Sequence, residues 1–369
     1  MNDNPEIHDD PVEPPSSMRI NRIIIPVIIG VGVVVYLLWR QFDFEEFKQI
    51  EWGTADWIWF FLAIAFLALR HLAYSNRLYV LSDKEFSFRK CIELIFIWEF
   101  SSAVSPTSVG GSAVALFVLS QEKLAVSKTT AIVLYTVVLD TIFFITTIPL
   151  LFLLIGPIII RPEMTSFSDL DGWALTFALA YGFMLLYGAF FFYALFIKPQ
   201  NGQRLLTWIS RWKILSRWEE DIRALGDGFV VASREIWYKP KRYHFKAFVS
   251  TAVAWSLRFL VINCLILAIV PDISHAIMDQ FKIYSRLETM FVILAFSPTP
   301  GGAGFHEYVF GGFLRDYIPV GLAALVALVW RLLTYYSYLL AGAIIIPNWL
   351  RGILAQRRKN KSRSESVGE

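Results

Sequence analysis

Charged residues are scarce in this sequence. Asp, Glu, Lys and Arg make up 18% of its 369 residues, whereas soluble domains contain about 25%. Hydrophobic residues make up 56%, and the mean hydropathy is +0.52. Apolar runs long enough to cross a bilayer recur along the whole chain, which a soluble core does not require. The composition therefore predicts an all-α, polytopic membrane protein and excludes an ordinary soluble domain.

Residues typical of cofactor and metal chemistry are also few. The two cysteines, Cys91 and Cys264, lie in or beside apolar segments and are predicted to be small core residues rather than disulfide partners or metal ligands. The five histidines are scattered without ligand spacing, and no nucleotide-binding glycine motif is present. We therefore expect no cofactor, no metal and no nucleic-acid partner.

The loops between the apolar segments differ in their content of Lys and Arg. Loops 70–90 and 197–245 and the tail after residue 350 are rich in basic residues, and such regions stay in the cytoplasm. If every apolar segment crossed the bilayer, the two basic loops would lie on opposite sides. The apolar segments are 22–40, 55–74, 91–119, 129–156, 173–196, 246–270, 285–313 and 319–349, and the loops poor in Lys and Arg are 41–54, 157–172 and 271–284.

Two of these segments are interrupted by similar sequences that begin 192 residues apart, Ser105 to Gly111 and Ser297 to Gly302. Proline and paired glycines break helices, and non-helical backbone at membrane depth is tolerated only where protein or water surrounds it. If both segments are re-entrant hairpins, every basic loop and both termini become cytoplasmic. We therefore predict six full spans plus two re-entrant broken helices, with eight full spans, two of them kinked, as the alternative.

The re-entrant interpretation makes the two halves an inverted-topology repeat. Repeat one covers about 55–156 and repeat two about 246–350, in the same order but with opposite sidedness. Binding sites in such repeats lie near the bilayer midplane, where the broken helices meet. The linker 197–245 is predicted to be either an amphipathic helix on the cytoplasmic leaflet or a helical hairpin packed on the bundle. The predicted divisions of the chain are a disordered segment 1–21, a membrane domain 22–350 and a basic cytoplasmic tail 351–369.

Ionisable residues inside the apolar segments are the first candidates for function, because charges at bilayer depth are costly. Glu99, Asp140 and Glu307 are candidates for charge or proton coupling. Asp140 and Arg331 each lie 30 residues after the first glycine of their break. Either they form an ion pair with each other, or Arg331 binds phosphate through its guanidinium fork.

The glycine pairs permit positive φ and close backbone approach, and the helix starts that follow them expose N–H groups to an anion such as a lipid phosphate. Tyr335 and Tyr336 either hydrogen-bond a head group or pack as aromatics. Arg70 and His71 end an apolar segment and are expected at the membrane interface. The predicted substrate-binding residues are Pro106, Gly110, Gly111, Ser112, Pro300, Gly301, Gly302, Gly304, Glu307, Arg331 and Tyr335.

Several of these stretches resemble one family over roughly residues 20–350. Pro300 to Glu307 resembles the P-G-G-x-G-x-x-E signature of the lysylphosphatidylglycerol synthase transmembrane (flippase-like) family, and Arg331 to Tyr336 resembles its Arg-Leu-Leu-Thr-aromatic stretch. Pro106 to Ser112 resembles the family's P-x-x-x-G-[GE] element, and Asp140 matches the Asp that closes its E-R-x-x-D stretch. Members are similar to the membrane half of the multiple peptide resistance factor, which moves aminoacylated phosphatidylglycerol between leaflets.

The resemblance implies a bacterial inner-membrane lipid translocator with a polar groove lined by two hairpins. This chain departs from the pattern at Gly111-Ser112, where an acid is usual, and at Thr136-Val137, where the family has Glu-Arg. No aminoacyl-transferase domain follows, so lysyl transfer is not expected, and without an ATP-binding motif movement would be downhill or coupled to an ion gradient. The open alternatives are a membrane enzyme acting on lipid or isoprenoid phosphate head groups and a non-transporting envelope scaffold. Expected partners are membrane phospholipids, with a homo-oligomer or a separate lipid-modifying enzyme also considered.

Overall fold

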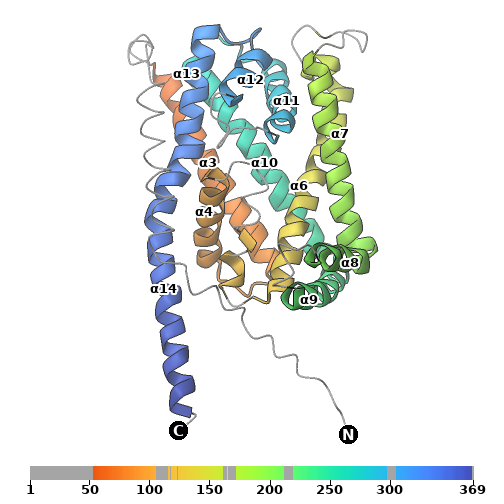
Figure 1. Ribbon diagram of the computed structural model, residues 1–369. Coiled ribbons are helices and arrows are strands. Elements are labelled where there is room, and N and C mark those ends of the chain that lie inside the picture. The colour runs from red at the N-terminus through yellow and green to blue at the C-terminus, as the bar shows by residue number, and fades with distance from the viewer. Residues whose placement is uncertain are drawn as a thin grey trace.

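Every element of the described chain is helical (Figure 1). The computed structural model describes residues 53–104, 115–116, 118–122, 124–160, 164, 172–211, 219–296 and 305–367. The elements are α3 (Thr54–Leu81), α4 (Phe88–Val104), α6 (Val126–Ile155), the 3-10 turn η1 (Pro157–Ile159), α7 (Gly172–Phe192), the π-helical turn η3 (Tyr193–Ile197), α8 (Pro199–Ser210), α9 (Glu219–Trp237), α10 (Lys241–Ile269), α11 (Ile277–Leu294), α12 (Phe305–Phe313), α13 (Val320–Arg331), the π-helical turn η6 (Leu332–Tyr336) and α14 (Ser337–Val367).

Five helical stretches in the described chain are long and apolar enough to cross a membrane, and they are Thr54–Leu81, Val126–Ile155, Ala174–Ile197, Lys241–Ile269 and Leu325–Ile353. Their outer faces carry large apolar side chains, with Leu153 81%, Leu186 73% and Ile344 70% exposed. Apolar residues on an outer surface suit lipid rather than water. The chain is therefore an all-α, multi-pass membrane protein, as predicted. The predicted span 22–40 lies outside the described residues.

The boundaries of α3 follow from local backbone chemistry. The side chain of Asp56 accepts a hydrogen bond of 2.8 Å from the Gly53 N–H, which satisfies a free donor at the helix start. The helix ends at Leu81, and Asp83 and Lys84 follow with φ of 53° and 64°. This left-handed backbone cannot continue a right-handed helix. The predicted segment 55–74 is thus too short, and Arg77 lies inside a helix rather than in a basic loop.

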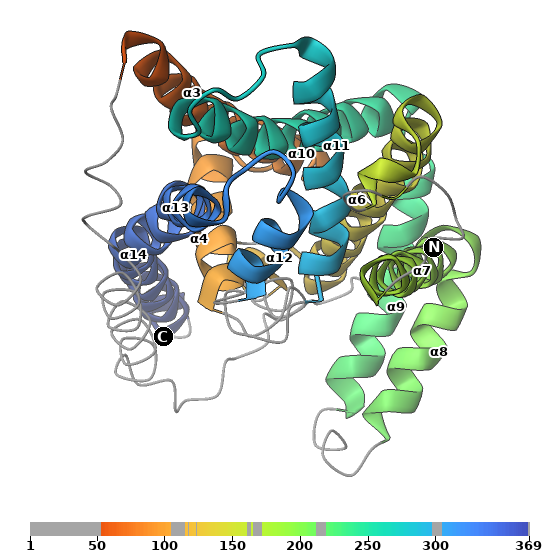
Figure 2. The same cartoon turned by 90° about the horizontal axis from the view of Figure 1, so that it is seen from above.

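Helices α3 and α10 pack closely and lie side by side in both views (Figures 1 and 2). Near the end of α3, the hydroxyl of Tyr243 donates to the Leu81 carbonyl at 3.2 Å. One turn earlier on α3, the Asn76 amide donates to the Ser250 hydroxyl at 2.8 Å. Since the end of α3 meets the start of α10, the two helices run antiparallel.

The two interrupted segments pack at opposite ends of the bundle. Helix α4 lies in the half that holds α8 and α9, whereas α11 and α12 lie in the other half (Figure 1). At the first end, Lys90 near the start of α4 pairs with Glu122 at 2.7 Å. At the other end, Arg286 of α11 donates to the Phe313 carbonyl at 3.2 Å and pairs with Asp316. In each case the ion pair joins residues on either side of the interruption.

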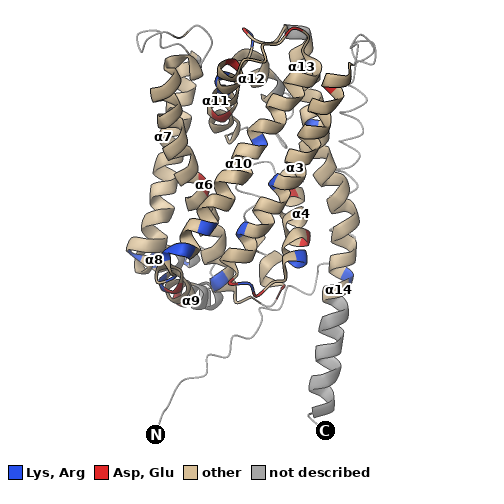
Figure 3. Ribbon diagram, turned by 180° about the vertical axis from the view of Figure 1, so that it is seen from behind, with Lys and Arg blue, Asp and Glu red and all other residues tan. Residues whose placement is uncertain are grey.

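The linker 197–245 forms two helices, α8 and α9, that pack along each other, and α9 packs against α6. This arrangement agrees with the predicted helical hairpin on the bundle rather than with a single surface helix. Lys and Arg gather at this end of the molecule (Figure 3). Between α9 and α10, Lys239 pairs with Asp83 at 3.0 Å and with Glu235 at 3.2 Å. Burial opposes the charge of Lys239, but these hydrogen bonds outweigh it and raise the pKa of the ammonium group.

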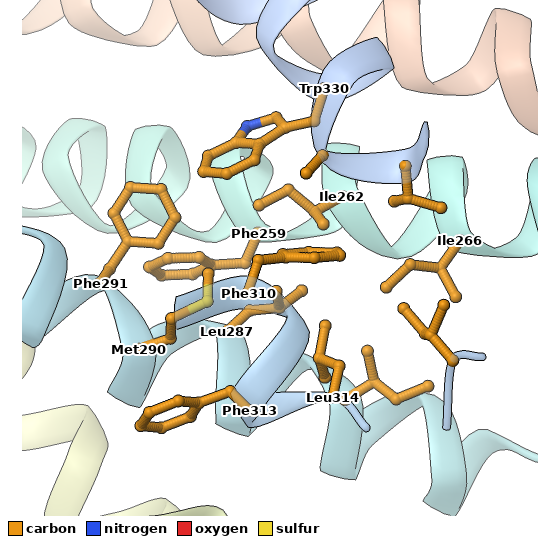
Figure 4. Packing of buried hydrophobic residues seen from close by; sticks show 14 of the residues in the cluster. Phe259, Ile262, Ile266, Leu287, Met290, Phe291, Phe310, Phe313, Leu314 and Trp330 are labelled. Atoms are coloured by element: carbon orange, nitrogen blue, oxygen red, sulfur yellow. The ribbon is translucent and has the colours of Figure 1, made fainter. Parts of the chain in front are cut away.

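Apolar packing joins the second half of the chain. Phe259 of α10, Leu287 and Met290 of α11, Phe310 of α12 and Trp330 of α13 meet in one cluster (Figure 4). A second cluster joins α3, α4, α6, α9, α10 and α14, and it includes Cys91, which is buried and free, as is Cys264 in the first cluster. The cysteines are thus small core residues, as predicted. These clusters hold the polar side chains of the interior in fixed positions.

Candidate functional site

A cluster of charged side chains lies along the second half of α3 and beside the middle of α10. Arg70 is only 1% exposed and forms an ion pair of 2.7 Å with Glu99 of α4. Its guanidinium also donates to the Tyr338 hydroxyl of α14 at 3.3 Å and stacks on the Tyr74 and Tyr338 rings at 5.0 Å and 5.6 Å. The prediction that Arg70 lies at the membrane interface is wrong, because α3 continues for eleven residues beyond it.

His71 completes a directed chain of hydrogen bonds beside this ion pair. Its Nε2 atom lies 3.1 Å from the Ile92 carbonyl, which can only accept, so Nε2 carries the ring proton. The Nδ1 atom lies 3.1 Å from the Tyr338 hydroxyl, which also accepts from Arg70. His71 is thus a buried residue in the interior and not an interface residue as predicted.

Asp140 of α6 lies in the same interior but faces α3 and α10. Its carboxylate pairs with Arg77 at 2.5 Å and accepts from the Trp255 indole at 2.9 Å. Arg77 follows Arg70 by seven residues, two helical turns, so both point from the same face of α3. Of the two alternatives for Asp140 and Arg331, the ion pair between them is not found among the described contacts, where the partner of Asp140 is Arg77.

Arg258 of α10 is the third arginine of the cluster. Its guanidinium is half-buried and lies 5.1 Å from the ring centres of both Trp255 and Phe291. Its Nε atom is buried without a hydrogen-bond partner, and no carboxylate in the described part of the chain forms an ion pair with it. Arg70 and Arg77 are neutralised by Glu99 and Asp140. The charge of Arg258 is not neutralised, so the cluster has one positive charge in excess.

A partly buried positive charge that has no carboxylate partner among the described residues is costly, so the cluster is suited to an anion. Arginine also presents a planar fork of donors that matches a phosphate or carboxylate. The arrangement can therefore bind one anionic group between α3 and α10. We call Arg70, Arg77, Glu99, Asp140 and Arg258 the interior charge cluster.

Arg331 and the tyrosines that follow it lie between α4 and α14. Arg331 is 4% exposed, and its guanidinium stacks on the Tyr335 and Tyr336 rings at 5.0 Å and 5.9 Å. The Tyr335 hydroxyl donates to the Ala103 carbonyl at 3.1 Å, at the end of α4. These contacts agree with the packing interpretation of both tyrosines, and they place Arg331 beside the first interrupted segment.

Most of the predicted glycine and proline sites cannot be compared with the structure. Glu307 lies in α12, but its side chain is outside the described part, and so are the remaining predicted residues: Pro106, Gly110, Gly111, Ser112, Pro300, Gly301, Gly302 and Gly304. Their role in binding stays a prediction.

Sequence reasoning missed Arg70, Arg77 and Arg258 as candidate site residues. Arg258 lies in the middle of the apolar segment 246–270 and carried the same signal as Glu99, a charge at depth. Arg70 and Arg77 were assigned to a loop because their charge was taken as the end of the segment. Their spacing of seven residues, which places them on one helical face, was the signal that linked them.

Comparison with known proteins assigns this chain to a family. Residues 23–342 match the family described as the lysylphosphatidylglycerol synthase TM region. The chain belongs to this family. The matched range contains all five residues of the interior charge cluster and confirms the resemblance noted in the sequence.

One relative and the solved structures complete the comparison. A UPF0104 membrane protein of Archaeoglobus fulgidus is 23% identical over 337 residues, which cover 86% of this chain and 95% of that protein. No solved structure matches the chain. The family is named for a transmembrane region, and this chain is a membrane protein of that family.

Proposed function

We propose that the protein moves a phosphate-bearing lipid between the two leaflets of the membrane and binds the head group at the interior charge cluster. The observation that carries this proposal is the excess positive charge of three arginines over two carboxylates inside an apolar bundle. A lipid phosphodiester carries one negative charge and would balance it. Arg258 is the residue that makes this contact, because Arg70 and Arg77 already have carboxylate partners.

Moving a charged head group through hydrocarbon is expensive. Estimates for one charge at the bilayer centre run from ~3 kcal/mol to more than 10 kcal/mol. A cluster that replaces water around the phosphate lowers this barrier while the acyl chains remain in lipid. Guanidinium groups serve this purpose well, because they donate two parallel hydrogen bonds to phosphate oxygens. We expect the groove to run between the two interrupted segments.

The proposal includes an inverted repeat with two re-entrant hairpins. The contacts Lys90–Glu122 and Arg286–Asp316 support it, since each joins the two ends of one interrupted segment. Arg258 follows Arg70 by 188 residues, which is also the separation of the last residues of α3 and α10, Leu81 and Ile269. The two arginines therefore hold equivalent positions on an antiparallel helix pair, near the axis that would relate the halves. A site on that axis presents similar donors to both leaflets.

Cysteine accessibility tests this topology. In a variant without Cys91 and Cys264, single cysteines replace residues at the ends of each interrupted segment: the exposed Arg89 and the partly exposed Gln121 for the first, and the exposed His275 and Arg315 for the second. We expect a membrane-impermeant thiol reagent to label both cysteines of a pair from the same side and the two pairs from opposite sides. Labelling of one pair from opposite sides of the membrane would show a complete span and contradict the hairpins.

Lipid exchange by the purified full-length protein tests the activity. Liposomes of phosphatidylcholine with a trace of fluorescent phosphatidylglycerol receive a membrane-impermeant quencher from outside. Protein-free liposomes lose only the signal of the outer leaflet, whereas proteoliposomes should lose the inner-leaflet signal as well. Repeating the assay with phosphatidic acid and with aminoacylated phosphatidylglycerol identifies the preferred head group. If no phosphate-bearing lipid exchanges faster than in protein-free liposomes, the proposed function is wrong.

A further inference from the structure

A second buried carboxyl group lies outside the interior charge cluster. Glu288 of α11 is fully buried, at 0% exposure. It follows Ile277 by eleven residues, which corresponds to roughly 16 Å of helix from the start of α11. Helix α11 packs against α6, α7, α10 and α12, so Glu288 is enclosed by helices from both halves of the chain.

Glu288 has few hydrogen bonds for a buried carboxyl group. The Thr147 hydroxyl of α6 donates to Oε1 of Glu288, and it also lies 2.7 Å from the Phe143 carbonyl. A hydroxyl has one proton, so these two acceptors share it. The other oxygen, Oε2, is buried and has no hydrogen-bond partner among the described residues. Such a site favours the protonated carboxyl, because an ionised carboxylate needs more hydrogen bonds than these to be buried.

The described groups that contact Glu288 supply no positive charge. Tyr284 brings a second hydroxyl to the carboxyl from α11 itself and also lies 3.2 Å from the Ser256 hydroxyl of α10. Tyr181 of α7 also lies close enough to Glu288 for the two groups to interact electrostatically. On α12, the His306 ring packs against Trp330. No Lys, Arg or His in the described ranges forms an ion pair with Glu288. An ionised carboxylate in these surroundings would be strongly unfavourable.

Glu99 is the residue of the first half that corresponds to Glu288, and its carboxylate lies beside a positive charge. Helices α4 and α11 begin at Phe88 and Ile277, 189 residues apart, and Glu99 and Glu288 are separated by the same number. Glu99 is held as a carboxylate by Arg70 at 2.7 Å. The two halves thus hold one fixed charge and one carboxyl that can gain or lose a proton.

We propose that Glu288 is a proton-binding site that couples lipid movement to a transmembrane proton gradient. This inference rests on the proposed function. The Arg258 guanidinium stacks on the ring of Phe291 at 5.1 Å, and Phe291 follows Glu288 by three residues on α11. Arg258 therefore lies against the turn of α11 that carries Glu288, although the two residues do not form an ion pair. The protonated carboxyl leaves Arg258 available to the lipid phosphate.

Loss of the proton to water leaves a carboxylate that competes with the phosphate for Arg258. Binding of a proton and binding of the phosphate then favour each other, and this coupling is reciprocal. A lipid arriving at Arg258 promotes proton uptake at Glu288, and release of the proton promotes release of the lipid. The protonated carboxyl therefore corresponds to the site with lipid bound, and the ionised carboxyl corresponds to the site without lipid.

Infrared difference spectroscopy tests the proton site without reference to transport. The wild-type full-length protein should show a carboxylic-acid C=O band at neutral pH that is lost in Glu288→Gln. The matched control is Glu93→Gln, at a partly exposed carboxylate on α4 that pairs with Lys90, and it should keep the band. Both variants are isosteric, and thermal melting in detergent shows whether they fold. Absence of the band in a folded wild-type protein, or its persistence in Glu288→Gln, would overturn the proposal.

Lipid exchange under a pH gradient tests the coupling. In the quencher assay, the wild-type rate should differ about 5- to 150-fold between the two directions of the gradient, the usual range of coupling between two sites. Glu288→Gln mimics the protonated acid and should exchange at a rate that does not depend on the gradient, whereas Glu93→Gln should behave as wild type. A gradient-dependent rate in Glu288→Gln would contradict the coupling. Absence of exchange by the wild type would instead refute the proposed function, while the infrared result on the proton site would stand.

Discussion

Arg258→Gln should reduce lipid exchange by about 30-fold or more. Arg258 is the only member of the interior charge cluster without a carboxylate partner among the described residues, so its guanidinium is the group available to a lipid phosphate. Removing one partner of a buried, hydrogen-bonded charge pair costs about 2–5 kcal/mol, and each 1.4 kcal/mol corresponds to a factor of ten. The measurement is the initial rate of inner-leaflet quenching in proteoliposomes at equal protein content.

Two further variants serve as controls for Arg258→Gln. Arg258→Lys keeps the charge but loses the planar fork, so its exchange rate should fall between those of wild type and Arg258→Gln. Arg89→Gln, at an exposed position on α4, removes the same charge outside the cluster and should exchange as wild type. Folding should be unaffected in Arg258→Gln, because the substitution leaves no carboxylate unpaired. A wild-type rate in a folded Arg258→Gln protein would remove Arg258 from the proposed mechanism.

Arg70→Ala should lower the stability of the protein strongly. The substitution leaves Glu99 without its partner at 2.7 Å and removes the donor to Tyr338. Breaking a buried ion pair on one side costs about 3–5 kcal/mol, because an uncompensated charge stays in the interior. The expected result is a fall in the free energy of unfolding by that amount and a lower melting temperature in detergent, measured on the purified protein.

A double-mutant cycle separates the loss of the pair from the penalty of an isolated charge. Arg70→Met combined with Glu99→Leu removes both charges and keeps most of the volume, so it should recover most of the stability lost in Arg70→Ala. Glu99→Gln alone should cost less than Arg70→Ala, because a neutral amide remains beside the arginine. If the double variant is as unstable as Arg70→Ala, the ion pair is not the reason for the loss.

The architecture was largely predictable because span length and polarity are properties of contiguous sequence. The segment 129–156 corresponds to α6 at Val126–Ile155, and the segment 246–270 corresponds to α10 at Lys241–Ile269. The largest error was at α3, which continues to Leu81 because Arg70 and Arg77 are tolerated within the helix. They are tolerated because Glu99 and Asp140 approach them from other helices. That approach has no signature in the local sequence.

The candidate site was predictable only in part. Glu99 and Asp140 were recognised because a carboxylate in an apolar segment is conspicuous. Their partners were not, since Arg70 and Glu99 are 29 residues apart and Arg77 and Asp140 are 63 residues apart. Glu288 was missed although it lies in the segment 285–313, because nothing in its neighbouring residues distinguishes it from a solvated charge.

The sequence by itself determined that the chain is an all-α membrane protein, where its apolar helices lie and which family it belongs to. Apolar length, helix-breaking residues and motif spacing are local, and each can be read from one stretch of chain. The tertiary structure alone decided which charges are neutralised and which are left over. Packing of α4, α6 and α10 around α3 gave Arg70 and Arg77 their partners and left Arg258 without a carboxylate among the described residues. Packing of α11 against α6 and α10 enclosed Glu288 among hydroxyl groups. These outcomes depend on distances between segments remote in sequence, and such distances exist only once the helices are packed.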